Sequence, residues 1–80
     1  MKSLDERLTL AKTILREVSR EPLSRTTLDK KVTRKTGTHA SFEGMFRYLI
    51  QKGCIQKSGQ KIRDPYCITE KGRKLLEGLP

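Results

Sequence analysis

The stretch FRYLIQKGCI, residues 46–55, contains the change of local structure that decides the fold. Phe46, Leu49 and Ile50 recur at helical spacing, and Gly53 follows them. Glycine closes a helix here because it adopts a left-handed backbone conformation at little steric cost. The sequence therefore predicts that a helix ends at about Lys52. Its core-facing residues are predicted to be Phe42, Met45, Phe46, Leu49 and Ile50.

Beyond Gly53 the pattern becomes that of a β-hairpin. Residues 54–57 form one extended segment, Ser58-Gly59 a turn, and the stretch YCITEKG, residues 66–72, contains the returning segment. Asp64-Pro65 interrupts that return, so we expect a long loop and only partial pairing. Thr69 then caps a last short helix, whose apolar residues are Leu75, Leu76 and Leu79.

Upstream of these stretches the sequence predicts a first helix from Ser3 to about Ser19. Ser3 and Glu6 have the spacing of a capping box, and Glu21-Pro22 ends the helix. Its apolar residues, which form a broad stripe, are Leu4, Leu8, Leu10, Ala11, Ile14, Leu15 and Val18.

A second helix is capped by Ser24 or Thr26 and contributes Leu28 and Val32 to the core. Gly37 ends it. Thr38 or Ser41 caps the third helix, which continues into the stretch quoted above.

The two quoted stretches resemble a known family. Residues 46–55 resemble the L-x-x-L-x-x-x-G-L-I end of the recognition helix in archaeal and bacterial winged-helix regulators, and residues 66–72 resemble the Y-x-I-T-x-K-G that follows the wing. The resemblance implies an α+β fold, a single winged helix-turn-helix domain over residues 1–80 with three helices, a two-stranded wing and a short C-terminal helix. Residues 32–38 are longer than the family's usual turn, which means either an extended second helix or a loop.

The charge is strongly biased along the chain. Its 80 residues carry a net charge of +9, and ten basic but only two acidic residues lie between positions 25 and 63. An excess of this size indicates a polyanionic partner, and the winged-helix resemblance places it on the elements that face DNA. We therefore expect double-stranded DNA as the partner.

The third helix carries the candidates for reading bases in the major groove. Arg47 and Gln51 lie opposite its core face. The hydrogen-bonding groups of Arg47 suit guanine, and those of Gln51 suit adenine. Arg47 has an alternative, because Glu43 lies four residues before it and is placed for a surface ion pair. Gly44 has two interpretations, a bare backbone deep in the groove or a close contact between helices inside the protein. Tyr48 is expected to donate its hydroxyl to a phosphate.

The remaining candidates are expected to contact the DNA backbone. Free amides and the helix dipole at the start of the third helix favour phosphate there. The wing is expected to lie along the backbone or in the minor groove. The candidates are Thr38, His39 and Ser41 at the start of helix three, Arg25, Lys31, Arg34 and Lys35 in helix two, and Lys57, Lys61 and Arg63 in the wing.

Other classes of function find little support. His39 is the only histidine, Cys54 and Cys67 lack the spacing of a zinc site, and no nucleophile or phosphate-loop motif occurs, so we expect neither an enzyme nor a cofactor, metal or small-molecule ligand. The cysteines are expected to be reduced. No apolar run approaches the length of a membrane span or signal peptide, which predicts a cytoplasmic, nucleoid-associated protein.

Three functions remain as alternatives. The first is a small transcriptional regulator that prefers certain DNA sequences, the second an architectural protein that coats DNA without preference, and the third a winged helix that binds an acidic protein. Leu10 and Ile14 widen the stripe of the first helix beyond the needs of one core, which suggests a homodimer through that helix.

Overall fold

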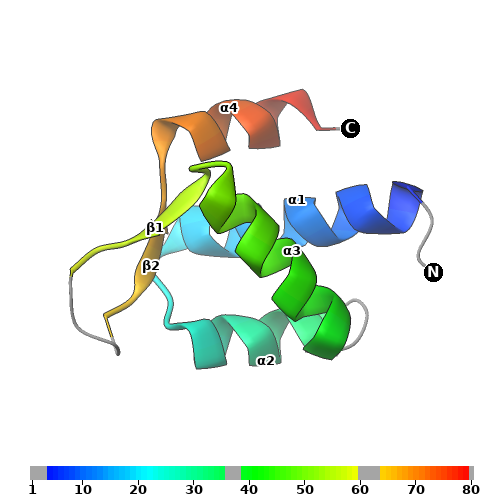
Figure 1. Ribbon diagram of the computed structural model, residues 1–80, viewed down its shortest axis with the longest axis horizontal. Coiled ribbons are helices and arrows are strands. Elements are labelled where there is room, and N and C mark those ends of the chain that lie inside the picture. Colours follow the sequence, from blue (N-terminus) through cyan, green and yellow to red (C-terminus); the bar gives the residue numbers. More distant parts are fainter. Residues whose placement is uncertain (1–3, 36–38, 60–63, 80) are drawn as a thin grey trace.

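The order of the elements is the one predicted (Figure 1). The computed structural model describes residues 4–35, 39–59 and 64–79, and only the backbone at residues 4, 5, 39 and 40. The elements of these residues are α1 (Leu4–Arg20), α2 (Arg25–Lys35), α3 (His39–Gln51), β1 (Ile55–Lys57), β2 (Tyr66–Ile68) and α4 (Glu70–Gly78).

Three of the predicted local signals are confirmed. The Ser24 hydroxyl accepts a hydrogen bond from the amide of Thr27 at 3.2 Å and caps α2. Gly53 has a φ of 77°, the left-handed conformation expected after α3. Thr69 caps α4 by accepting from the amide of Gly72. The predicted cap of α1, Ser3, lies outside the described residues.

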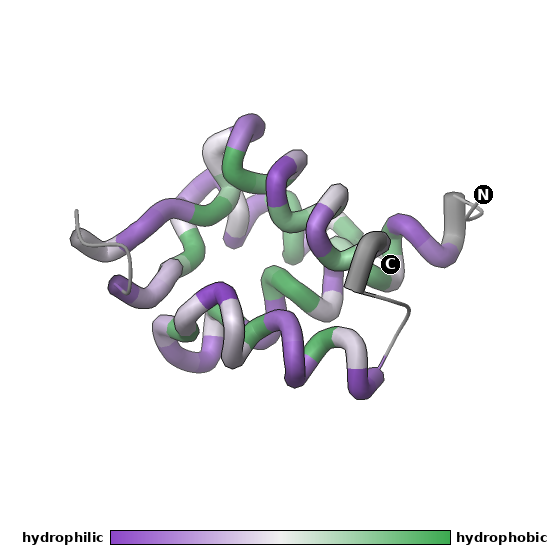
Figure 2. The backbone as a smooth tube through the Cα atoms, turned by 60° about the horizontal axis from the view of Figure 1, so that its bottom comes forward, coloured by the Kyte–Doolittle hydropathy of each residue, from purple (hydrophilic) through white to green (hydrophobic). Residues whose placement is uncertain are grey.

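Helix α1 is the centre of the packing. It lies behind α3 and between α2 and α4 in Figure 1, and it contacts these three helices as well as strand β2. Hydrophobic and hydrophilic residues alternate along the helices in Figure 2, the pattern of helices that bury one side. The buried cluster consists of Leu10, Ile14, Leu15, Val18, Leu23, Leu28, Val32, Phe42, Phe46, Leu49, Cys54, Ile55 and Ile68.

The dimer surface predicted on the first helix is wrong. Leu10 is 3% exposed and Ile14 is fully buried within a single copy of the chain. The wide apolar stripe is needed because partners surround α1, so both residues belong to the monomer core. They are therefore not available to contact a second copy.

Helix α3 buries most of the side predicted for it. Phe42, Phe46 and Leu49 are buried and Met45 packs at the edge of the cluster, but Ile50 is 40% exposed. At 100° per residue Ile50 lies at the margin of the apolar arc, so its side chain lies beside the buried cluster and not within it. The prediction that Ile50 belongs to the core is therefore wrong.

The sequence allows two interpretations of the segment before α3, an extended helix or a loop. Helix α2 continues to Lys35, so residues 32–35 are helical and the first interpretation is correct for them. Residues 36–38 lie outside the described part of the chain.

The hairpin is short, with a long connection, as predicted. Ile55 pairs with Ile68 and Lys57 with Tyr66 in antiparallel register. An additional contact was not predicted: Leu23, between α1 and α2, exchanges two backbone hydrogen bonds with Tyr66, at 3.0 and 2.7 Å. This bridge attaches the end of β2 nearest the loop to the segment just before α2.

Candidate nucleic-acid interface

The outer side of α3 carries the predicted base-reading residues. Gly44, Arg47 and Gln51 are exposed, and they lie opposite the buried Phe42 and Phe46. No other helix lies in front of α3 in Figure 1. On the inner side of the helix, Phe46 packs edge-to-face on Tyr66 of β2, with ring centroids 4.8 Å apart, and this contact attaches α3 to the hairpin.

Gly44 does not serve the packing of the protein. A Cβ built at this position meets nothing within 4 Å, so the interpretation as a close contact between helices inside the protein is wrong. Glycine in a helix interior costs about 1 kcal/mol relative to alanine. No described neighbour requires a glycine here, so of the two interpretations only the approach to a major groove stays as a prediction.

Arg47 does not form the ion pair with Glu43 that was its alternative. Glu43 instead accepts a charge-assisted hydrogen bond from Arg25 at the start of α2. In the part of the chain that the structure describes, the Arg47 guanidinium has no acidic partner. The pairing with Arg25 therefore neutralises the acid on α3 and leaves Arg47 available for an external ligand.

Tyr48 lies on the flank of the outer side and is 49% exposed. The ammonium of Lys52 lies 5.6 Å from the centre of its ring, a cation–π contact. Sequence reasoning did not single out Lys52, although the four-residue spacing of Tyr48 and Lys52 was a signal for this contact. The contact adds a positive charge to the end of α3.

The predicted phosphate contacts at the start of α3 are only partly described. His39 is the first residue of α3, as expected from a cap at position 38, but its side chain and Thr38 lie outside the described residues. Ser41 is half-buried and has a partner within the chain.

The basic residues of α2 differ in their availability. The ammonium of Lys35 donates a hydrogen bond to the carboxylate of Glu17 on α1 at 2.6 Å, and Lys31 lies 4.0 Å from Glu21. Arg34 is exposed, and no described acid pairs with it. Lys35 thus faces α1 and Lys31 faces the residue just after it, and the structure does not bring them together with Arg47.

Glu17 is a charged residue in the core that sequence reasoning missed. It is 5% exposed, and the hydrogen bond from Lys35 lowers the pKa of its carboxyl although desolvation acts in the opposite direction. Its position between Ile14 and Val18, inside the apolar stripe of α1, was the signal for burial. The pair links α1 to the end of α2, just before the segment that leads to α3.

In the hairpin, Lys57 is exposed beside the loop. The amide of the next residue, Ser58, donates a hydrogen bond to the carbonyl of Pro65 at 2.9 Å and closes the described part of the loop. The other two predicted contacts of the wing, Lys61 and Arg63, lie outside the described residues.

The described residues also bear on metal binding, disulfide formation and membrane insertion. Among these residues, no group of three or more His, Cys, Asp or Glu side chains is placed to hold a metal ion. Cys54 is a buried thiol and Cys67 a half-buried one, and neither is in a disulfide, as predicted. None of the described helices combines the length and the apolar character that crossing a membrane requires.

Comparison with known proteins supports the same fold. The crystal structure of the archaeal viral protein F-93 of SSV1 is similar to this chain with a TM-score of 0.68 and 24% sequence identity, over 88% of this chain and 79% of that one. At this identity the likeness concerns the fold. No curated protein sequence matches the chain significantly.

Residues 6–80 match the family described as winged helix-turn-helix, which covers both stretches that carry the resemblance in the sequence. The order of helices, the hairpin after α3 and the capped α4 are those expected for that fold. The chain therefore belongs to the winged helix-turn-helix family.

Proposed function

We propose that this protein binds double-stranded DNA, with α3 in the major groove, the hairpin on the backbone or in the minor groove, and a preference for certain sequences that suits a small transcriptional regulator. The observation that carries the proposal is the exposed surface of α3. There a glycine that the core does not require lies one turn from an arginine without a described acidic partner.

This surface leaves room for a ligand to approach α3 and carries side chains that can pair with bases. At Gly44 no side chain separates the helix backbone from a ligand, so α3 can approach base edges closely. Arg47 supplies a bidentate donor for guanine and Gln51 a donor and acceptor pair for adenine. Because the Arg25 pair neutralises Glu43, no uncompensated acid on this flank opposes the phosphates.

Among the predicted backbone contacts, Arg34 and Lys57 are exposed and have no described acidic partner, and we expect both to contact phosphate. Lys35 and Lys31 are left out of this set, because their ammonium groups lie beside Glu17 of α1 and Glu21, which follows α1. Thr38, His39, Lys61 and Arg63 remain candidates on the basis of the sequence.

The proposal is tested by competition binding at fixed salt concentration. Duplexes selected by the protein from a random pool are labelled, and binding is challenged with selected or random duplex. A regulator should prefer its selected site by about a thousandfold or more. Equal competition by random duplex would instead indicate an architectural protein that coats DNA. Absence of duplex binding at low salt would overturn DNA binding and favour the acidic protein partner.

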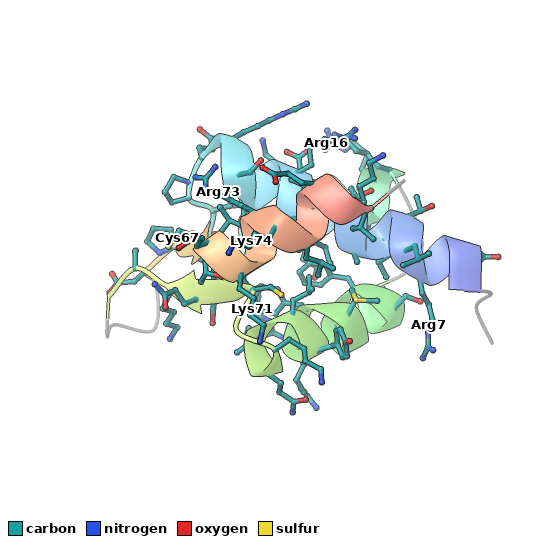
Figure 3. All side chains as sticks on the ribbon, turned by 90° about the horizontal axis from the view of Figure 1, so that it is seen from above. Arg7, Arg16, Cys67, Lys71, Arg73 and Lys74 are labelled. Atoms are coloured by element: carbon teal, nitrogen blue, oxygen red, sulfur yellow. The ribbon has the colours of Figure 1, made fainter. Side chains whose placement is uncertain are left out.

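A matched pair of variants locates the reading surface. Arg47→Gln should lower the preference for the selected site, because it removes the fork that pairs with guanine. Arg16→Gln removes the same charge from the exposed side of α1, far from α3 (Figure 3), and should leave the preference unchanged. Equal effects of the two substitutions would show that Arg47 contributes only charge.

A further inference from the structure

The end of α3 and the start of α4 are joined in one rigid junction. The Thr69 hydroxyl donates a hydrogen bond to the carbonyl of Gly53 at 2.5 Å, and the Thr69 amide donates to the carbonyl of Cys54 at 3.0 Å. A Cβ at Gly72 would lie 2.2 Å from the Cys54 carbonyl oxygen, so the two segments are in direct backbone contact. Side chains at this junction therefore hold a fixed position relative to α3.

Two lysines project from this junction. Lys52 follows the last residue of α3 and lies over the ring of Tyr48. The aliphatic part of Lys71 passes beside Gly53, with its Cδ 4.0 Å from where a Cβ of that glycine would be. Figure 3 shows Lys71 on the side of α4 that faces the end of α3. The junction thus places a lysine from α4 beside the base-reading helix.

The charges of these lysines are not compensated within the described chain. Both side chains are exposed, and neither is in an ion pair with a described acid. In contrast, Lys74, one turn further along α4, lies 4.0 Å from Glu70. Two exposed lysines at one junction, neither paired with a described acid, are suited to an anion, and phosphate is the anion of the partner proposed for α3.

We infer that Lys52 and Lys71 bind backbone phosphate of the DNA on the flank of α3 that faces α4. The inference rests on the proposed function and extends its contact surface from α3 to α4, an element whose net charge gave no indication of a role in binding. Strands β1 and β2 are not part of this contact, so the duplex is held on the α4 flank as well as by the hairpin.

Single substitutions test the assignment. Lys71→Gln and Lys52→Gln should each weaken binding about fivefold at low salt, equally for selected and random duplex, and should reduce the slope of log K against log salt by about 0.9. The control is Arg73→Gln, which removes the same charge from the other side of α4 (Figure 3) and should leave the slope unchanged. Thermal unfolding of each variant verifies that the fold is retained.

Ethylation interference then locates the contact. On a selected duplex, the wild type should show phosphates whose ethylation blocks binding, and Lys71→Gln should lose interference at one or two of them, distinct from those lost in Lys57→Gln. Equal slopes for Lys71→Gln, Arg73→Gln and the wild type, or an unchanged interference pattern, would overturn the inference while leaving DNA binding intact. If the wild type does not bind duplex at all, the proposed function and this inference both fail.

Discussion

Gly44 is a position at which stability and DNA binding are expected to favour different residues. Because a Cβ there meets nothing within 4 Å, Gly44→Ala should stabilise the protein by about 1 kcal/mol through the higher helix propensity of alanine. The same methyl group should weaken binding to selected DNA, since it separates the backbone of α3 from the base edges. Thermal unfolding and gel-shift titration of one variant measure both effects. Unchanged affinity would mean that α3 is not approached closely at this position.

Glu17 is expected to contribute to the pH dependence of stability. The bond from Lys35 lowers the pKa of its carboxyl below the ordinary value of 4.5, so the folded state favours the charged form. The pair therefore stabilises the fold fully above pH 4.5, and this contribution is lost as the pH falls through the lowered pKa.

Replacing the carboxylate tests this assignment. Glu17→Gln should destabilise the protein by about 1–2 kcal/mol at pH 7, and the difference from wild type should shrink below pH 4.5. Glu21→Gln is the matched control, since Glu21 is exposed and 4.0 Å from its lysine, and should have almost no effect. Denaturant unfolding at several pH values measures both. A difference that persists unchanged at low pH would contradict an ionic role for Glu17.

At the scale of elements, the position of α4 depends on one glycine. A Cβ at Gly72 would lie 2.2 Å from the Cys54 carbonyl oxygen and 2.8 Å from Cγ1 of Ile68, so neither neighbour can yield without moving the hairpin or the helix. Gly72→Ala should therefore destabilise the fold by about 3 kcal/mol. Gly78→Ala, on the same helix with open space around it, should change stability little. Unfolding midpoints compare the two, and equal midpoints would show that α4 shifts freely.

At the scale of the whole molecule, the excess charge should appear as a steep dependence on salt. Arg34, Arg47, Lys52, Lys57 and Lys71 are exposed without a described acidic partner, whereas Arg25, Lys31, Lys35 and Lys74 lie beside acids. With about four to five phosphates neutralised, the slope of log K against log salt for random duplex should be about −4. Fluorescence anisotropy from low to moderate salt measures it. A slope near −1 would mean that the positive surface does not meet the duplex.

The sequence predicted most of the fold because its signals are local. The caps at Ser24 and Thr69, the left-handed Gly53 and the period of the apolar residues act within a few positions of the chain, and each was confirmed. The uneven distribution of charge was equally visible, and it indicated the kind of partner. These features depend only on residue type and spacing, so no knowledge of the packing was required.

The tertiary structure decided which of the candidate residues are available to a partner. Arg25 pairs with Glu43, and Lys35 pairs with Glu17, and the two partners are 18 positions apart in the sequence in each case. No local pattern could therefore predict that these basic residues are paired within the protein. Leu10 and Ile14 became core residues because several elements converge on α1. Lys71 reached α3 only through the Thr69 junction. The sequence by itself determined the helices, the hairpin and the distribution of charge. Pairing, burial and proximity depend on neighbours that folding brings together. For that reason only the tertiary structure determined the candidate binding surface.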